Sequence, residues 1–326
     1  MIKKFLISAL TMLSLNAFAN DGIGYSSGGG IILGKTDNIA MKKEVLNVSY
    51  KKISVDYEFL NEGDKILEET IIFPLPSYTA DFEMSDAYYG EPNNFLIQVN
   101  GKNVSYTTQI KAIIDDKDIT KSLIKIGLTD EQIAYFPINS PFNIKVKKLT
   151  DSQLKQLISN NFVDNENHIP LWSVESAYIW KQTFNPGELL KVHHEYTPFV
   201  AAGPGFSYIQ EDTIKDFCMD KSFIKSVDKL TSIKNYVPAY QVSYILKSGN
   251  SWKNGIEDFT LNLNKESSDE LISLCFPGDF KKINSKTLQL HLTNFKPTND
   301  LLVYFANYND EKNSLEVKKK PIKINK

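Results

Sequence analysis

The sequence predicts a mainly β protein of the α+β class, in which an antiparallel β-sandwich domain with a helical insertion is followed by a smaller β domain. Short segments in which apolar and polar residues alternate recur along most of the chain, as in half-buried strands. Clusters of Asn, Gly, Asp and Pro separate these segments. Helical patterns are confined to a stretch near residues 115–168 and to one segment after residue 210. Many short strands joined by turns are typical of sandwich folds.

The first residues have the composition of a secretory signal peptide, assigned to 1–19. Lys3 and Lys4 precede an apolar run, and a small-residue cleavage site ends at Ala19, so we expect cleavage after Ala19. The apolar run has about half of the roughly 20 residues that span a bilayer as a helix. We therefore expect export to the periplasm, with an uncleaved membrane anchor as the alternative. No later segment is apolar enough to predict an integral membrane segment after processing.

Paired alternating segments define the predicted first domain, residues 20–210. An Asn-Gly dipeptide at 100–101 and an Asn-Pro-Gly turn at 185–187 each lie between two such segments, which indicates β-hairpins. In the second pair, Tyr178 and Trp180 share one face and are expected to fill the core. The strands expected in this domain are 53–59, 66–73, 95–99, 104–108, 178–184 and 190–196.

A helical insertion is expected near residues 115–168. Its clearest helix covers 150–162, because Thr150 and Gln153 form a capping-box pattern and apolar residues then recur on one face. Shorter helices are expected at 118–126 and 130–136.

The predicted second domain, residues 211–326, begins with a linking helix over 211–230. Acidic residues near the start of this segment and lysines near its end suit the helix dipole. The strands expected after it are 242–246, 259–263, 272–276, 288–292 and 301–305.

This second domain contains both cysteines of the chain, Cys218 and Cys275. An even cysteine count in an exported protein favours a disulfide. Closing a loop of this length could stabilise the fold by roughly 4 kcal/mol in the chain-entropy model. Two buried free thiols are the alternative.

Charge and motif context argue against nucleic-acid and nucleotide partners. All 37 basic residues are lysine, so the planar arginine fork that reads base edges is missing, although an AT-rich genome would also favour lysine codons. Residues 29–36 match the letters of a phosphate-binding loop. No amphipathic helix follows them, and such a loop needs a helix N-terminus to hold phosphate. We therefore expect no cofactor.

Residues with catalytic or metal-binding chemistry show no pattern that predicts a reaction. His193 and His194 are adjacent in a predicted strand, so they point to opposite faces and cannot hold one metal ion together; no metal site is expected, and His194 is expected inside. The sequence contains no Gly-x-Ser-x-Gly nucleophile motif. Carboxylates such as Glu175 or Asp258 could serve a hydrolase only if they faced a partner carboxylate across a cleft.

Aromatic residues provide the binding candidates. Trp252, Trp172 and Tyr208 lie in or beside predicted turns and loops, where aromatic rings can bind sugars or peptides. Trp252 is the best candidate for exposure, because it follows a Ser-Gly-Asn-Ser stretch.

Several stretches together resemble a family of exported bacterial proteins known only as a domain of unknown function, DUF4424. The resemblance covers nearly all of the predicted mature chain, and it implies an exported protein without supplying a catalytic residue. The family typically has a different residue than Gly34 before the lysine that corresponds to Lys35. This difference supports the interpretation that residues 29–36 match the letters of a phosphate-binding loop by chance. The resembling stretches are Gly29–Leu33, Lys35–Ile39, Val55–Phe59, Phe73–Pro76, Tyr178–Trp180, Gln182–Phe184, Pro186–Gly187, His194–Pro198, Phe217–Cys218 and Trp252–Phe259.

These observations favour a non-catalytic envelope protein that binds a protein or glycan partner. The first alternative is a hydrolase that acts on an envelope polymer. The second alternative is a structural subunit that assembles by pairing of exposed strand edges.

Overall fold

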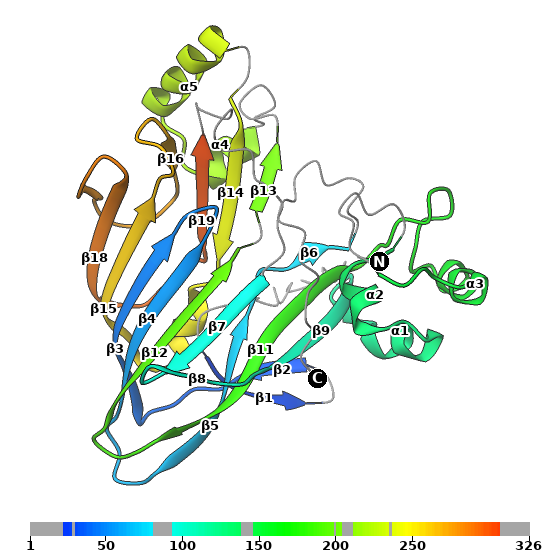
Figure 1. Ribbon diagram of the computed structural model, residues 1–326, viewed down its shortest axis with the longest axis horizontal. Coiled ribbons are helices and arrows are strands. Elements are labelled where there is room, and N and C mark those ends of the chain that lie inside the picture. The colour runs from blue at the N-terminus through cyan, green and yellow to red at the C-terminus, as the bar shows by residue number, and fades with distance from the viewer. Residues whose placement is uncertain are drawn as a thin grey trace, which may run out of the picture.

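The computed structural model describes residues 22–27, 30–80, 93–137, 146–198, 200–203, 211–234 and 237–306. The predicted signal peptide and Tyr208 lie outside these ranges. The described chain is mainly β, as the alternating pattern predicts, and its strands form three sheets (Figure 1).

The largest sheet has eight strands in the order β17-β18-β15-β3-β4-β12-β7-β8. All its pairs are antiparallel except β15 with β3, which run parallel. Its strands are β3 (Ile39–Val48), β4 (Ile53–Asn61), β7 (Asn93–Val99), β8 (Lys102–Asn103), β12 (Leu189–Thr197), β15 (Lys253–Asn264), β17 (Lys281–Lys282) and β18 (Thr287–Phe295).

Two further antiparallel sheets complete the fold. The seven-stranded sheet has the order β10-β9-β11-β5-β1-β2, and β6 pairs with β11 beside this path. It contains β1 (Gly22–Ser27), β2 (Gly30–Leu33), β5 (Leu67–Pro74), β6 (Tyr78–Thr79), β9 (Thr107–Ile114), β10 (Lys117–Asp118) and β11 (Ser173–Phe184). The four-stranded sheet, β13-β14-β19-β16, contains β13 (Val200–Gly203), β14 (Ala239–Tyr244), β16 (Leu271–Ser273) and β19 (Leu301–Ala306).

The eight- and seven-stranded sheets pack face to face. The β4–β5 and β11–β12 connections each join one sheet to the other at the lower end of Figure 1. Inside, the Phe73 and His194 rings lie 5.2 Å apart between centroids, and the Phe95 and Tyr178 rings stack at 3.9 Å. Tyr178 and Trp180 are buried as predicted. The apolar faces of the two sheets therefore form a common core, as in a sandwich.

Asn61 links these two connections where the sheets meet. Its side chain is fully buried, and its Nδ2 donates to the Lys65 carbonyl at 2.8 Å and to the Phe184 carbonyl at 2.9 Å. Its Oδ1 accepts from the Gly63 N–H at 3.0 Å. One buried amide therefore fixes the geometry of both turns.

The sheets do not divide at residue 210, where the sequence predicts a domain boundary. β15 and β18 extend the sheet of β3 and β4, so strands from both predicted domains share hydrogen bonds. The four-stranded sheet packs on the same core, where Tyr50 and Tyr240 stack with centroids 4.3 Å apart. The division at residue 210 stays a prediction, and the pairing of β15 with β3 is a long-range contact that leaves no local trace in the sequence.

The helical insertion is confirmed. It contains α1 (Thr120–Ile126), α2 (Asp130–Ala134) and α3 (Asp151–Ser159). The capping box of Thr150 and Gln153 is present at the start of α3, as predicted. Trp172 anchors the insertion to the sandwich, because its Nε1 donates to the Ile133 carbonyl at 3.0 Å.

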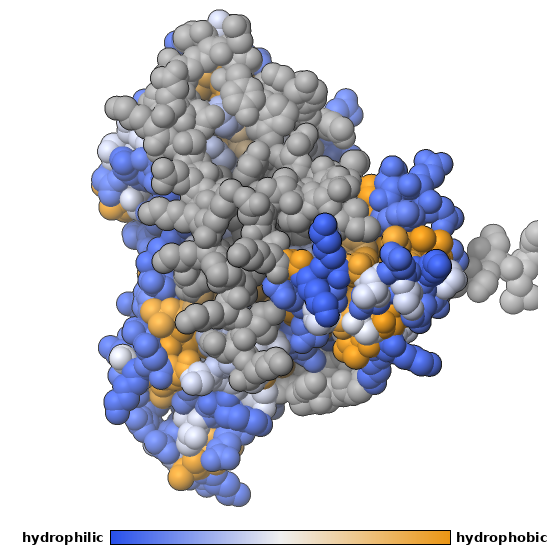
Figure 2. All heavy atoms as spheres, turned by 45° about the vertical axis from the view of Figure 1, so that its right-hand side comes forward, coloured by the Kyte–Doolittle hydropathy of each residue, from blue (hydrophilic) through white to orange (hydrophobic). Residues whose placement is uncertain are grey.

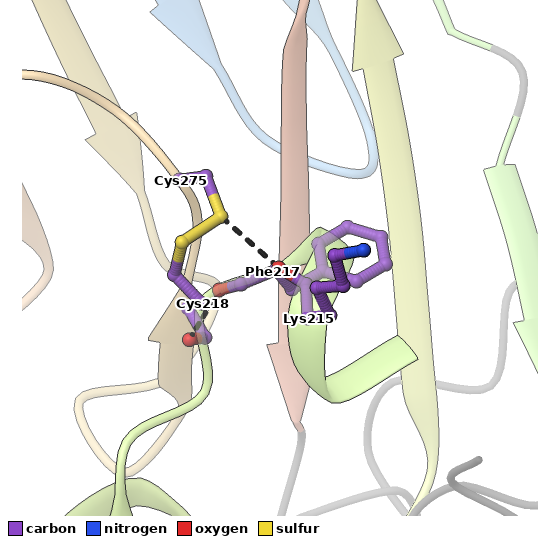
Figure 3. Close-up of a disulfide and its surroundings, with 5 residues drawn as sticks. Lys215, Phe217, Cys218 and Cys275 are labelled. Carbon is purple, nitrogen blue, oxygen red and sulfur yellow. Dashed lines mark hydrogen bonds between the residues drawn. A yellow bond between two sulfur atoms is a disulfide. The ribbon is translucent and has the colours of Figure 1, made fainter. Parts of the chain in front are cut away.

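The linking helix predicted over 211–230 is two helices, α4 (Glu211–Asp216) and α5 (Lys221–Lys234). The break contains Cys218, whose φ of 49° interrupts the helical path. Cys218 forms the predicted disulfide with Cys275, which follows β16, as Figure 3 shows. Phe217 and Met219 on either side of Cys218 are buried in a second apolar cluster between these helices and the four-stranded sheet.

Two predicted strands differ from the structure. A strand over 104–108 is expected to pair with β7. In the structure β8 pairs with β7, and β9 then joins the other sheet. The strand expected over 272–276 ends at Ser273, because the chain turns there toward the disulfide.

Candidate functional site

The outward face of the eight-stranded sheet, called the outer face below, is the main concentration of polar side chains that the structure describes. Along β4 the inward residues Val55, Tyr57 and Phe59 are buried in the core. The residues between them on β4 therefore point outward. β12 repeats this arrangement: His194 lies inside as predicted, and His193 lies on the outer face. The outer-face residues of these two strands are Ser54, Asp56, Glu58, Lys191, His193 and Glu195.

One row of this face is centred on a His–Asp pair. Across the neighbouring strands, His193 lies opposite both Gln98 and Asp56, and the row continues through Val45, Thr260 and His291. The His193 Nδ1 is 2.7 Å from Asp56 Oδ1, and its Nε2 is 3.6 Å from Glu195 Oε2. The ring is therefore held between two carboxylates.

A second row is an amide ladder. Gln289 Nε2 donates to Asn262 Oδ1 at 2.9 Å, and Asn262 Nδ2 donates to Asn47 Oδ1, also at 2.9 Å. Ser54 and Glu195 continue the row on β4 and β12. Because these residues come from strands that are far apart in the sequence, only the sheet register brings them into line.

Between β3, β4, β12 and the β7–β8 turn, the outer face contains a pocket of about 280 Å³. Lys43 lies opposite Glu58, and Glu58 lies opposite Lys191 in the same row. The Lys191 Nζ is 3.6 Å from Glu58 Oε1. Gly101 in the turn has a φ of +76° and open space around it, so the backbone bends without obstructing the pocket. The lining residues are Lys43, Val45, Asp56, Tyr57, Glu58, Gln98, Gly101, Lys191, Val192 and His193.

Lys43 is the least constrained cation of the pocket. Within the described ranges, its Nζ has no carboxylate oxygen within 4.0 Å, whereas Lys191 has one and His193 has two. The neighbouring Lys42 does form ion pairs, with Glu62 and Glu257, but it points toward the hairpin end of the sheet.

The two tryptophans predicted to bind a ligand are buried in this structure. Trp252 is 0% exposed and packs on Phe59, with ring centroids 4.4 Å apart, because the apparent turn before it is a 3₁₀ turn that leads directly into β15. Trp172 is 1% exposed and anchors the helical insertion. Tyr208 lies outside the described residues. Neither tryptophan has a ring surface to offer a ligand in this structure.

The carboxylates considered for hydrolysis do not converge. Glu175 lies on the outward face of the seven-stranded sheet opposite Lys111, where burial raises its pKa, Lys111 opposes that rise and Asp118 adds to it. Asp258 lies on the outer face of the other sheet, 2.9 Å from His291 Nε2. Because the two sheets pack through their inner faces, these groups are on opposite sides of the sandwich.

The segment after Lys35 and Thr36 becomes strand β3 rather than a helix, so the letters at 29–36 lack the context of a phosphate-binding loop. Among the described residues, no group of three His, Cys, Asp or Glu side chains is arranged to hold a metal ion.

Exposed apolar side chains do not form a comparable site. On the face shown in Figure 2, hydrophobic residues are visible beside the helices and at the lower end. The most exposed large ones in the described ranges, Ile66, Ile283, Ile124 and Leu171, lie in separate segments of the chain. Single exposed apolar residues are normal on protein surfaces.

The comparisons with known proteins identify a family. Residues 19–304 match the family described as a domain of unknown function, DUF4424. The chain belongs to this family. The match includes every strand of the outer face, and it confirms the resemblance seen in the sequence. No curated protein matches the sequence. None of the helices in the described ranges is long and apolar enough to cross a membrane.

Two solved structures show a distant likeness to this DUF4424 protein. A Legionella pneumophila protein named a "putative nutrient binding protein" is 14% identical, with a TM-score of 0.42, and the match covers 89% of this chain and 72% of that one. Native yeast LTA4 hydrolase is 7% identical, with a TM-score of 0.29, over 83% of this chain and 29% of that one. Scores this low carry no argument about fold or ligand.

Proposed function

We propose that this DUF4424 protein is an exported, non-catalytic protein of the cell envelope that binds a polar partner, either a protein or a glycan, on the outer face. The observation that supports it is the pocket between β3, β4 and β12, with the two polar rows beside it. A continuous sheet holds these groups at fixed spacing, with neighbouring strands about 4.8 Å apart. Binding sites benefit from such rigid placement of polar groups.

The arrangement suits recognition better than catalysis. A nucleophilic mechanism needs a base with a free nitrogen or oxygen directed at a nucleophile. In the pocket, both nitrogens of His193 face carboxylates instead, at 2.7 Å and 3.6 Å. The amide side chains of the ladder also bond to each other in one row. Their remaining donors and acceptors form a flat array that can bond to a partner.

The envelope location rests on the predicted leader and on the disulfide. Structural disulfides persist in oxidising compartments such as the periplasm. Cell fractionation with N-terminal sequencing tests this part. A mature chain that begins at Asn20 in the periplasmic fraction is expected, and a full-length chain in the cytosol would contradict it.

Binding is tested with the mature protein and two matched variants. Glu58→Gln alters the pocket, and Glu68→Gln makes the same change on the outward face of the other sheet, where Glu68 is exposed opposite Thr183. Envelope extract is passed over each immobilised protein. We expect a protein or glycan that the wild type and Glu68→Gln retain and Glu58→Gln loses. Equal retention by all three proteins would remove the outer face from consideration.

The assembly alternative makes a different prediction. A subunit that pairs through strand edges would form oligomers without any added partner. Light scattering of the purified mature chain distinguishes the two, because a monomer that retains an envelope partner is expected here.

A further inference from the structure

We infer that the outer-face pocket binds a small zwitterion, a free α-amino acid or a dipeptide, with its carboxylate on Lys43 and its ammonium between Asp56 and Glu58. This inference rests on the outer face being a binding surface, as proposed above, and assigns to its pocket a small-molecule ligand in addition to the protein or glycan partner.

The charges that line the pocket require a ligand of both signs. Lys43 and Lys191 are balanced by Asp56 and Glu58, so the lining is neutral overall when His193 is neutral. A dianion would lie against the two carboxylates, and a dication would lie against the two ammonium groups. Only a ligand that carries separate positive and negative groups can complement both.

The positions of these charges fit an α-amino acid. Asp56 and Glu58 are two residues apart on β4 and point to the same face, which separates their Cα atoms by about 6.8 Å. An ammonium between them can reach both carboxylates. Lys43 lies on the adjacent strand, directly opposite Glu58, and lacks its own ion pair among the described residues. The carboxylate of an α-amino acid, whose carbon is two bonds from the ammonium nitrogen, can therefore reach its Nζ.

Neighbouring contacts hold these groups in place. Asp56 uses one oxygen on His193, at 2.7 Å, and its side chain remains 58% exposed, so its second oxygen can accept from a ligand. Gln98 is held by its Nε2, which donates to Asn103 Oδ1 at 3.0 Å, and its Oε1 remains as a further acceptor at the rim. Val45 provides an apolar neighbour for a small side chain.

Size and chemistry disfavour other polar ligands. A volume of 280 Å³ corresponds to about nine water molecules at ~30 Å³ each, which suits a ligand of about ten non-hydrogen atoms. A sugar ring would gain from an aromatic face. The one aromatic residue that lines the pocket, Tyr57, is 1% exposed and points inward.

The test uses L-alanine, two derivatives that each lack one of its charges, and NMR titration of the full mature protein. L-alanine carries both charges, N-acetyl-L-alanine lacks the ammonium, and L-alaninamide lacks the carboxylate. We expect L-alanine to shift the amide signals of β4 and β12 with at least tenfold tighter binding than either analogue. Exposed charge pairs contribute modestly, so dissociation constants near the millimolar range are expected.

Two variants separate recognition from folding. Lys43→Gln should abolish the preference for L-alanine over L-alaninamide, and Glu58→Gln should weaken the preference over N-acetyl-L-alanine. Glu68→Gln, on the opposite side of the sandwich, should retain both preferences.

The outcomes distinguish this inference from the proposed function. Equal binding of the three ligands, or none, would overturn the zwitterion assignment. If an envelope partner is still lost in Glu58→Gln, the binding function stands with another ligand class. If neither the retention of a partner nor the binding of a ligand depends on Glu58, both the zwitterion inference and the proposed function are refuted.

Discussion

Removal of the disulfide should destabilise the protein by roughly 4 kcal/mol. Cys218 and Cys275 are 57 residues apart in the sequence. The chain-entropy relation for a loop of that length gives an entropy loss of about 14 cal/mol/K in the unfolded chain, or about 4 kcal/mol at 25 °C. The bond also holds the α4–α5 segment against the four-stranded sheet, where Phe217 packs on Tyr304 of β19 with ring centroids 5.4 Å apart.

The assay is urea unfolding of the wild type and of the double variant Cys218→Ser/Cys275→Ser, with and without a reducing agent. We expect the reduced wild type and the double variant to lose similar stability, and the reducing agent to leave the double variant unchanged. A loss below about 1 kcal/mol would refute the loop-closure reasoning. A lowered m-value would show instead that the α4–α5 segment unfolds separately from the rest.

Three other predictions concern buried groups. Asn61→Ala removes three hydrogen bonds, two within the β4–β5 connection and one to the end of β11, so urea unfolding should show a loss of roughly 2–4 kcal/mol, against less than about 0.5 kcal/mol for exposed Asn185→Ala. Trp252→Ala should cost about 3–5 kcal/mol, because the ring is fully buried; a near-neutral change would contradict that burial. Burial raises the pKa of Glu270, although its hydrogen bond from Tyr50 opposes the rise. The protonated form therefore favours the fold, and this stability is lost as pH rises through the folded-state pKa; Glu270→Gln should flatten that part of a stability–pH profile.

The local patterns of the sequence determined many of the elements. Alternation along 53–59 and 190–196 predicted β4 and β12, because a strand with one buried face must repeat every second residue. The capping box at Thr150 and Gln153 predicted the start of α3, since both partners lie within one turn. The alternation also placed His193 and His194 on opposite faces.

The candidate site could not be predicted in the same way. Asp56, Glu58 and His193 each look like ordinary solvent-facing residues of a strand. Their meeting with Lys43 depends on the order β3-β4-β12 and on the register of each pair. A shift of one residue would turn each of these side chains to the other face. No short-range pattern encodes that choice.

The sequence alone determined many of the strands and helices and which two cysteines can pair, because these depend on neighbours within a few residues or on the only available partner. The tertiary structure decided that β15 extends the sheet of β3, that Trp252 is buried against Phe59, and that separate strands share one polar pocket. These features depend on contacts between residues far apart in the chain, whose energies arise only when the sheets assemble.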